Sequence, residues 1–239
     1  MKKLYEKSEL LFALVMITLY VVLFSASDSL SELLGVQKLI TAIAGSGLSL
    51  VLLFCLCRRG LCARYGLVKG TYEKGAYLYF FPLALMVSVN LWGGVQMNMT
   101  VTESVCYVIA MFCVGFLEEV IFRGFLFRAM AKDNVTSAVI VSSVTFGIGH
   151  IVNLLNGAEV LPTLLQICYA CAAGFLFVVI FIRSGSLVPC IVTHCAINAL
   201  SAFAVERGNA FSFITAGVLT VVSAVYAVWI LHRTPKKSL

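Results

Sequence analysis

Long apolar segments constrain this chain more than any other feature of its sequence. They cover residues 9–26, 39–57, 76–93, 103–126, 135–153, 161–182, 187–205 and 211–231. A helix needs about 20 mostly apolar residues to cross the hydrocarbon core of a bilayer. Apolar residues make up 61% of the chain and charged residues 12%, whereas a soluble domain is about half apolar and about a quarter charged. We therefore predict an all-α, polytopic integral membrane helix bundle of about eight transmembrane helices.

The whole chain, residues 1–239, is predicted to form a single transmembrane domain. Its segments follow one another without an internal repeat, a low-complexity tract or a linker long enough to separate two domains. The first segment could be read as a signal peptide, because Met1, Lys2 and Lys3 resemble the basic start of one. Its apolar stretch is longer than that of a typical signal peptide, so we expect a retained helix.

The positions of the basic residues predict how the bundle is oriented. With eight spans both termini lie on one side, and of the 17 lysines and arginines only Lys38 and Arg207 fall on the other side. Because positively charged loops are retained in the cytoplasm, we expect cytoplasmic termini and a location in the plasma membrane. The net charge of +6 is spread over these loops, so we predict no nucleic-acid partner.

Ionisable residues within the predicted spans mark the candidate functional site. Charges inside a bilayer are costly and usually functional. Glu118 and Glu119 lie within the fourth segment, His150 lies late in the fifth and His194 lies midway along the seventh. At a rise of about 1.5 Å per residue, three helices bring Glu118, His150 and His194 to a similar depth near the middle of the bilayer.

The spacing of these residues predicts which of them share a helix face. Glu119 and Arg123 are four residues apart, which allows an ion pair. Glu118 is turned about 100° from Glu119, so it is the better candidate for a working carboxylate. His194 and Asn198 are also four residues apart and are expected to share one face.

Two other sequence features have simpler explanations. The nine cysteines lie mostly within apolar segments, where free cysteine behaves as a small hydrophobe, and this explanation also fits the CxxC pair formed by Cys168 and Cys171. The aromatic-rich run from Phe116 to Phe127 is interpreted mainly as lipid-facing packing.

The candidate groups fit the hydrolysis of an amide bond. A carboxylate and an imidazole beside a water molecule form a general-base pair, and a second imidazole and an amide can donate hydrogen bonds to an oxyanion. Glu118, His150 and His194 could instead hold zinc with an open fourth position. These residue types leave a zinc-bound and a metal-free water as equal alternatives.

Three short motifs connect these residues to a known family. Glu118 to Arg123 reads EExxxR, Phe146 to His150 reads FxxxH, and His194 to Asn198 reads HxxxN. In this order, within residues 103–205, they resemble the CPBP family of intramembrane endopeptidases. This family, also called Abi or CAAX-protease-like, includes prenyl-protein endopeptidases and bacterial proteins linked to bacteriocin processing and self-immunity.

The resemblance implies an eight-helix protease that cleaves a membrane-associated, hydrophobic or lipid-modified peptide. By motif position, Glu118 and His150 would activate water, His194 and Asn198 would stabilise the oxyanion, and Arg123 would hold Glu119. The family is described both as a metalloprotease and as a glutamate-dependent, metal-free enzyme. Membrane lipid is the other expected partner, and neither the substrate nor the oligomeric state is predicted.

Two further classes of function stay open at the level of sequence. A non-enzymatic bacteriocin self-immunity or membrane interaction protein could use the same helical frame. A cation-coupled transporter could use the same buried ionisable groups, although the chain lacks the inverted repeat typical of many transporters.

Overall fold

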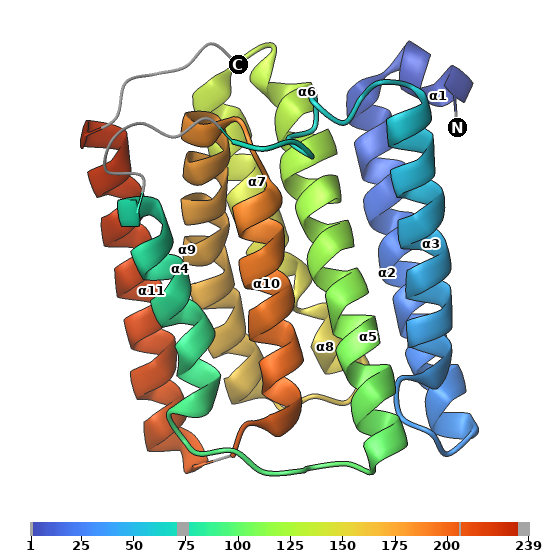
Figure 1. The fold of residues 1–239 in the computed structure, drawn as a ribbon, viewed down its shortest axis with the longest axis vertical. Coiled ribbons are helices and arrows are strands. Elements are labelled where there is room, and N and C mark those ends of the chain that lie inside the picture. Colours follow the sequence, from blue (N-terminus) through green and yellow to red (C-terminus); the bar gives the residue numbers. More distant parts are fainter. Residues whose placement is uncertain (1, 71–76, 206, 234–239) are drawn as a thin grey trace.

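The computed structural model describes residues 2–70, 77–205 and 207–233. The predicted start of the third span at residue 76, and the basic residues Lys74, Lys236 and Lys237 of the orientation argument, lie outside this part of the chain. Within it the protein is a bundle of long, roughly parallel helices (Figure 1), and the only β-type pairing is an isolated bridge between Val95 and Ala204. The prediction of an all-α membrane helix bundle is confirmed.

The main helices match the predicted apolar segments in order. They are α2 (Glu9–Leu33), α3 (Leu39–Arg58), α4 (Tyr77–Ser88), α5 (Val101–Glu118), α7 (Val135–Gly149), α9 (Val160–Ser184), α10 (Val188–Leu200) and α11 (Gly208–Arg233). Shorter elements are α1 (Lys2–Lys7), α6 (Arg128–Ala131), α8 (Val152–Leu155), the 3-10 turns η1 (Val89–Leu91) and η3 (Ser201–Phe203), and the π-helical segment η2 (Glu119–Phe127).

Among the described residues, six helical stretches are long and apolar enough to cross a membrane. The apolar helices Phe80–Leu91 and Val188–Phe203 are shorter, and they correspond to the predicted segments 76–93 and 187–205. α2 continues to Leu33, well beyond residue 26. The sequence hides this extension because Ser27 and Ser31 are polar, yet both are buried in the bundle.

The helix ends carry recognisable capping groups. Ser8 caps α2 by accepting a hydrogen bond from the Leu11 N–H, and Asn134 caps α7 in the same way. Thr100 and Glu103 form a capping box at the start of α5, which satisfies two backbone donors that would otherwise lack partners. α9 ends at Gly185 in the left-handed conformation, which glycine adopts without a steric penalty.

α5, η2 and α6 form one continuous helical stretch through the centre of the bundle, from Val101 to Ala131. η2 contacts α2, α7 and α9, so it has neighbours on several sides. Phe122, Phe125 and Phe127 are consequently buried, with exposed fractions of 4% or less. The expectation that this aromatic run faces lipid is therefore wrong for these three rings.

The bundle has two ends that matter for the site. We call the end that carries α1 and the last turn of α11 the terminal face, and the opposite end the distal face (Figure 1). Residues 59–70, 132–134 and 185–187 connect helices at the terminal face, whereas residues 34–38, 92–100 and 156–159 connect them at the distal face. α1 and the end of α11 share one face, as an even number of crossings requires.

Candidate active site

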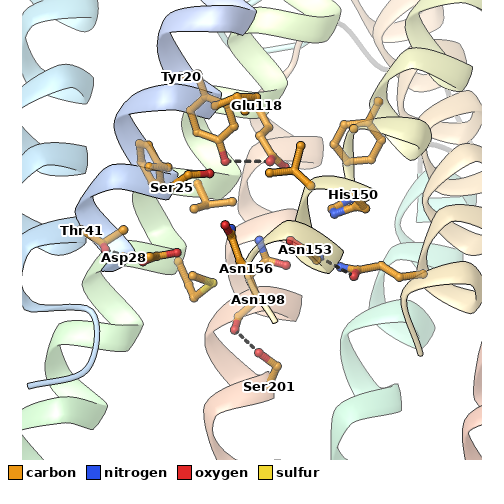
Figure 2. A pocket seen from close by; sticks show the side chains of 18 of the residues that line it. Tyr20, Ser25, Asp28, Thr41, Glu118, His150, Asn153, Asn156, Asn198 and Ser201 are labelled. Carbon is orange, nitrogen blue, oxygen red and sulfur yellow. Dashed lines mark hydrogen bonds between the residues drawn. The ribbon is translucent and has the colours of Figure 1, made fainter. Parts of the chain in front are cut away.

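A cavity of about 380 Å³ lies inside the bundle, between α2, α5, α7, α8, α9 and α10. Tyr20, Glu118 and His150 line its inner part (Figure 2). Asn198 lines the cavity from α10. The structure thus brings three of the four predicted catalytic residues, Glu118, His150 and Asn198, to the wall of one cavity.

Glu118 is the last residue of α5 and is only 9% exposed. Its Oε1 accepts a hydrogen bond of 2.7 Å from the hydroxyl of Tyr20. Its Oε2 is buried without a hydrogen-bond partner among the described residues and lies 3.5 Å from Nε2 of His194. One carboxylate oxygen is therefore held in place while the other is free to accept a proton.

A close contact between α5 and α10 positions this carboxylate. A Cβ atom added at Gly115 would lie only 2.7 Å from the backbone nitrogen of Cys195, so only glycine permits this approach. Gly115 lies one turn before Glu118, and Cys195 directly follows His194. The glycine thereby helps to set the distance between the Glu118 carboxylate and the His194 ring.

Glu119 and Arg123 form the ion pair that their spacing predicts. Glu119 Oε1 lies 3.1 Å from Arg123 Nη1, and both side chains are fully buried. The Arg123 guanidinium also lies over the ring of Phe146, 3.9 Å from its centroid, which adds a cation–π attraction. Gly174 leaves room for this group, because a Cβ there would lie 2.9 Å from Arg123 Nη2.

His194 lies between the two carboxylates rather than on the cavity wall. Its Nδ1 is 2.9 Å from Glu119 Oε1. Because the carboxylate of Glu119 is paired with Arg123 and accepts hydrogen bonds, the Nδ1 that faces it carries the proton. In the neutral ring this leaves Nε2, which faces Glu118, as the proton acceptor.

His150 ends α7 and lines the cavity. Its ring packs edge-on against Phe146, with 5.4 Å between centroids. No hydrogen bond of its ring nitrogens to another described residue is found, so both nitrogens are available to a ligand in the cavity. The Asn198 carboxamide is likewise unpaired within the described chain, and only its backbone oxygen is engaged, by the hydroxyl of Ser201.

The contacts of the predicted zinc ligands leave Glu118 Oε2, His194 Nε2 and the ring nitrogens of His150 without a hydrogen-bond partner among the described residues. Glu118 Oε1 is engaged by Tyr20, and His194 Nδ1 is engaged by Glu119. Within the part of the chain that the structure describes, no group of three or more His, Cys, Asp or Glu side chains is placed to hold a metal ion.

Sequence reasoning missed the contribution of the first span to this site. Tyr20 is near the middle of α2, and its hydroxyl reaches Glu118 from a helix outside the three motifs. Tyrosine in a membrane helix usually lies near the bilayer surface. A tyrosine near the middle of a span therefore indicates a candidate site residue. Because the predicted first span ends at residue 26 rather than at Leu33, the central position of Tyr20 is not evident from the sequence.

Comparisons with known proteins agree with the motif resemblance. A family model described as type II CAAX prenyl endopeptidase Rce1-like matches residues 100–200. This range is less than half of the chain, but it contains Glu118, His150 and His194. Comparison with curated proteins and with solved structures gave no match. Residues 100–200 are thus similar to CAAX-type intramembrane endopeptidases, and this match supports the motif resemblance to the CPBP family.

Proposed function

We propose that this protein hydrolyses a peptide bond in a membrane-associated or hydrophobic peptide with a water molecule activated by Glu118 and His150. One observation carries the proposal: Glu118 is buried in the bundle, has one oxygen fixed by Tyr20 and one without a partner, and shares a cavity with His150. A buried carboxylate with a free oxygen is suited to take a proton from water.

The reaction needs one proton to be moved twice. Glu118 removes a proton from the water, and the resulting hydroxide attacks the carbonyl carbon of the scissile bond. Glu118 then returns this proton to the amine, directly or by way of His150, as the C–N bond breaks. The products are a free carboxyl group and a free amine, and the side chains return to their initial state.

The remaining site residues are proposed to support this step. Asn198 would donate hydrogen bonds to the oxyanion, because its carboxamide is unpaired on the cavity wall. His194 would orient Glu118 and share its proton through Nε2, since it faces that carboxylate at 3.5 Å. Arg123 and Glu119 would fix the ring of His194 through Nδ1.

The cellular setting follows the charge distribution. The apolar helices and the match to the family model support an integral membrane protein. We propose that the terminal face lies in the cytoplasm, because Lys38 and Arg207 are the only basic residues on the distal side in the described part of the chain. The substrate class includes lipid-modified as well as unmodified hydrophobic peptides.

A cleavage screen tests the proposal. Purified wild-type protein in detergent is incubated with a library of hydrophobic and C-terminally modified peptides, beside Glu118→Gln and with and without a chelator. Glu159→Gln is the matched control, because Glu159 is an exposed acid that lies outside the cavity. We expect cleavage by the wild type and by Glu159→Gln, with or without chelator, and none by Glu118→Gln.

Three results would change the proposal. Loss of activity with the chelator would establish a metal-dependent mechanism in place of the metal-free one. Unchanged cleavage by Glu118→Gln would refute the role of Glu118. If folded wild-type protein cleaves no peptide, a non-enzymatic immunity or interaction role becomes the better explanation, and protection or partner binding that survives Glu118→Gln would support it.

A further inference from the structure

The cavity around Glu118 is closed toward the terminal face. Tyr65, in the connection between α3 and α4, is 1% exposed and packs edge-on against Phe125 with 4.9 Å between ring centroids. Phe125 in turn packs against Phe12 of α2 at 5.1 Å. The hydroxyl of Tyr65 is hydrogen bonded to that of Tyr5 at 2.7 Å. A layer of interlocked aromatic rings therefore lies on the terminal side of the bundle core.

Hydrogen bonds also hold residues 64–68 of this connection against the bundle. The backbone N–H of Leu187 donates to the carbonyl of Gly66 at 2.8 Å, and the hydroxyl of Ser186 donates to the carbonyl of Val68 at 2.6 Å. Arg64 forms a two-pronged ion pair with Glu9. The connection is thus tied to α2 on one side and to the start of α10 on the other.

Toward the distal face the same cavity is lined by polar groups. Asp28 and Lys38, which line it, form an ion pair of 2.7 Å, and Asp28 also accepts a hydrogen bond of 2.5 Å from Thr41. Asp28, Lys38, Asn153 and Asn156 also line an adjoining distal hollow of about 170 Å³. The cavity therefore reaches the distal face through a polar mouth, which we define by these four residues. Figure 2 shows Asp28, Asn153 and Asn156 on the side of the cavity away from Tyr20.

The chemistry of this mouth suits a peptide backbone. Asn153 is paired with Gln166 at 2.9 Å, while the side chain of Asn156 has no hydrogen-bond partner among the described residues. A carboxamide offers both donors and an acceptor, which match the C=O and N–H groups of an extended peptide. Lys38 neutralises Asp28, but Glu32 also lines the distal hollow and adds a negative charge, so the mouth disfavours an acidic segment.

The distance from the mouth to Glu118 matches a short peptide. Asp28 lies eight residues after Tyr20 on α2, which is about 12 Å along a helix. An extended chain spans this distance with about three to four residues at about 3.3 Å each. A polar segment of that length could occupy the cavity while its scissile bond reaches Glu118.

We infer that the substrate peptide reaches Glu118 from the distal face, through the mouth formed by Asp28, Lys38, Asn153 and Asn156. The distribution of basic residues orients the distal face away from the cytoplasm. The substrate is therefore a polypeptide segment presented on the non-cytoplasmic surface of the membrane. This inference rests on the proposed endopeptidase function for its biological meaning, but the direction of access can be measured separately.

Site-directed thiol labelling measures the direction of access. Three full-length variants are compared in sealed membrane vesicles: Ser25→Cys inside the cavity, Asn156→Cys in the mouth and Lys69→Cys in the exposed connection at the terminal face. A small, charged, membrane-impermeant methanethiosulfonate is added to right-side-out or inside-out vesicles. Peptide mass mapping then identifies each labelled site, so that the native cysteines are read individually.

We expect Ser25→Cys and Asn156→Cys to react in the same vesicles, and Lys69→Cys to react only in vesicles of the opposite orientation. The inference is overturned if Ser25→Cys reacts together with Lys69→Cys, or if it does not react from the distal side. If Lys69→Cys reacts from outside the cell, the non-cytoplasmic assignment of the distal face is overturned.

A cleavage measurement in the same vesicles separates this inference from the proposed function. A peptide that the wild type cleaves in detergent is added outside sealed vesicles. We expect cleavage only in the orientation in which Ser25→Cys is labelled. Cleavage only in the opposite orientation would refute distal access, whereas distal labelling with no cleavage in detergent would refute the proposed function and leave the access route intact.

Discussion

Replacing Gly115 with alanine tests how closely α5 and α10 must approach for the site to work. The added Cβ would lie 2.7 Å from the backbone nitrogen of Cys195, and an ordinary contact begins at 3.4 Å. The two helices must therefore separate by about 0.7 Å, and overpacking of this kind costs about 1–3 kcal/mol of stability. Displacements near 1 Å can lower the rate of a positioned reaction by about 100-fold, so we expect cleavage to fall by about tenfold or more.

The assay compares initial cleavage rates and Tm in detergent for Gly115→Ala and a matched glycine. Gly217→Ala is the control, because Gly217 is also inside a helix but has no atom within 4 Å of the added Cβ. Alanine favours the helix by up to about 1 kcal/mol at such a position, so the control should keep full activity and an equal or higher Tm. Wild-type activity and Tm in Gly115→Ala would refute the argument that this contact positions Glu118.

Further predictions concern the groups around the site and the closed terminal face. Tyr20→Phe removes a hydrogen bond to a charged group, which is worth about 1.5–3 kcal/mol. At about 1.4 kcal/mol per tenfold change in rate, the cleavage rate should fall by about 10- to 100-fold. A rate within twofold of wild type, or loss of folding, would contradict this. Arg123→Met leaves Glu119 buried and unpaired and should cost about 3–5 kcal/mol, and Tm measurements should show partial recovery in Arg123→Met/Glu119→Gln; no recovery would argue against the pair. Burial and the hydrogen bond shared with Tyr5 raise the pKa of Tyr65 above its usual value, so its contribution to stability is complete below about pH 10 and is lost as the pH rises further. Tyr65→Phe should therefore show a smaller fall in Tm above that pH, and an unchanged profile would contradict this.

The sequence is sufficient to predict the helices and part of the site. Apolar length predicts the bundle because backbone groups in lipid must be satisfied within helices. The Glu119–Arg123 pair follows from i,i+4 spacing and is present in the structure. These are local properties, which neighbouring residues determine without knowledge of how the helices pack.

The other site features depend on packing between distant segments. The contact between Tyr20 and Glu118 joins residues 98 positions apart, and no local pattern pairs them. His194 was expected to donate to an oxyanion together with Asn198, but it lies between Glu118 and Glu119. The i,i+4 spacing of His194 and Asn198 predicts only that both lie on the same side of α10. Which groups the His194 ring contacts depends on the close approach of α5 and α10 at Gly115.

The most direct test of the central claim is the cleavage rate of Glu118→Gln relative to wild type, on one peptide that the wild type cleaves and at equal Tm. General acid–base catalysis contributes about 10²- to 10⁴-fold, and glutamine keeps the shape of the side chain and its acceptor for Tyr20. We predict a loss within or beyond that range, with full activity in Glu159→Gln. If folded Glu118→Gln keeps more than about a tenth of the wild-type rate, the loss of rate is smaller than a general base contributes. That result would contradict the assignment of Glu118 as the residue that activates water.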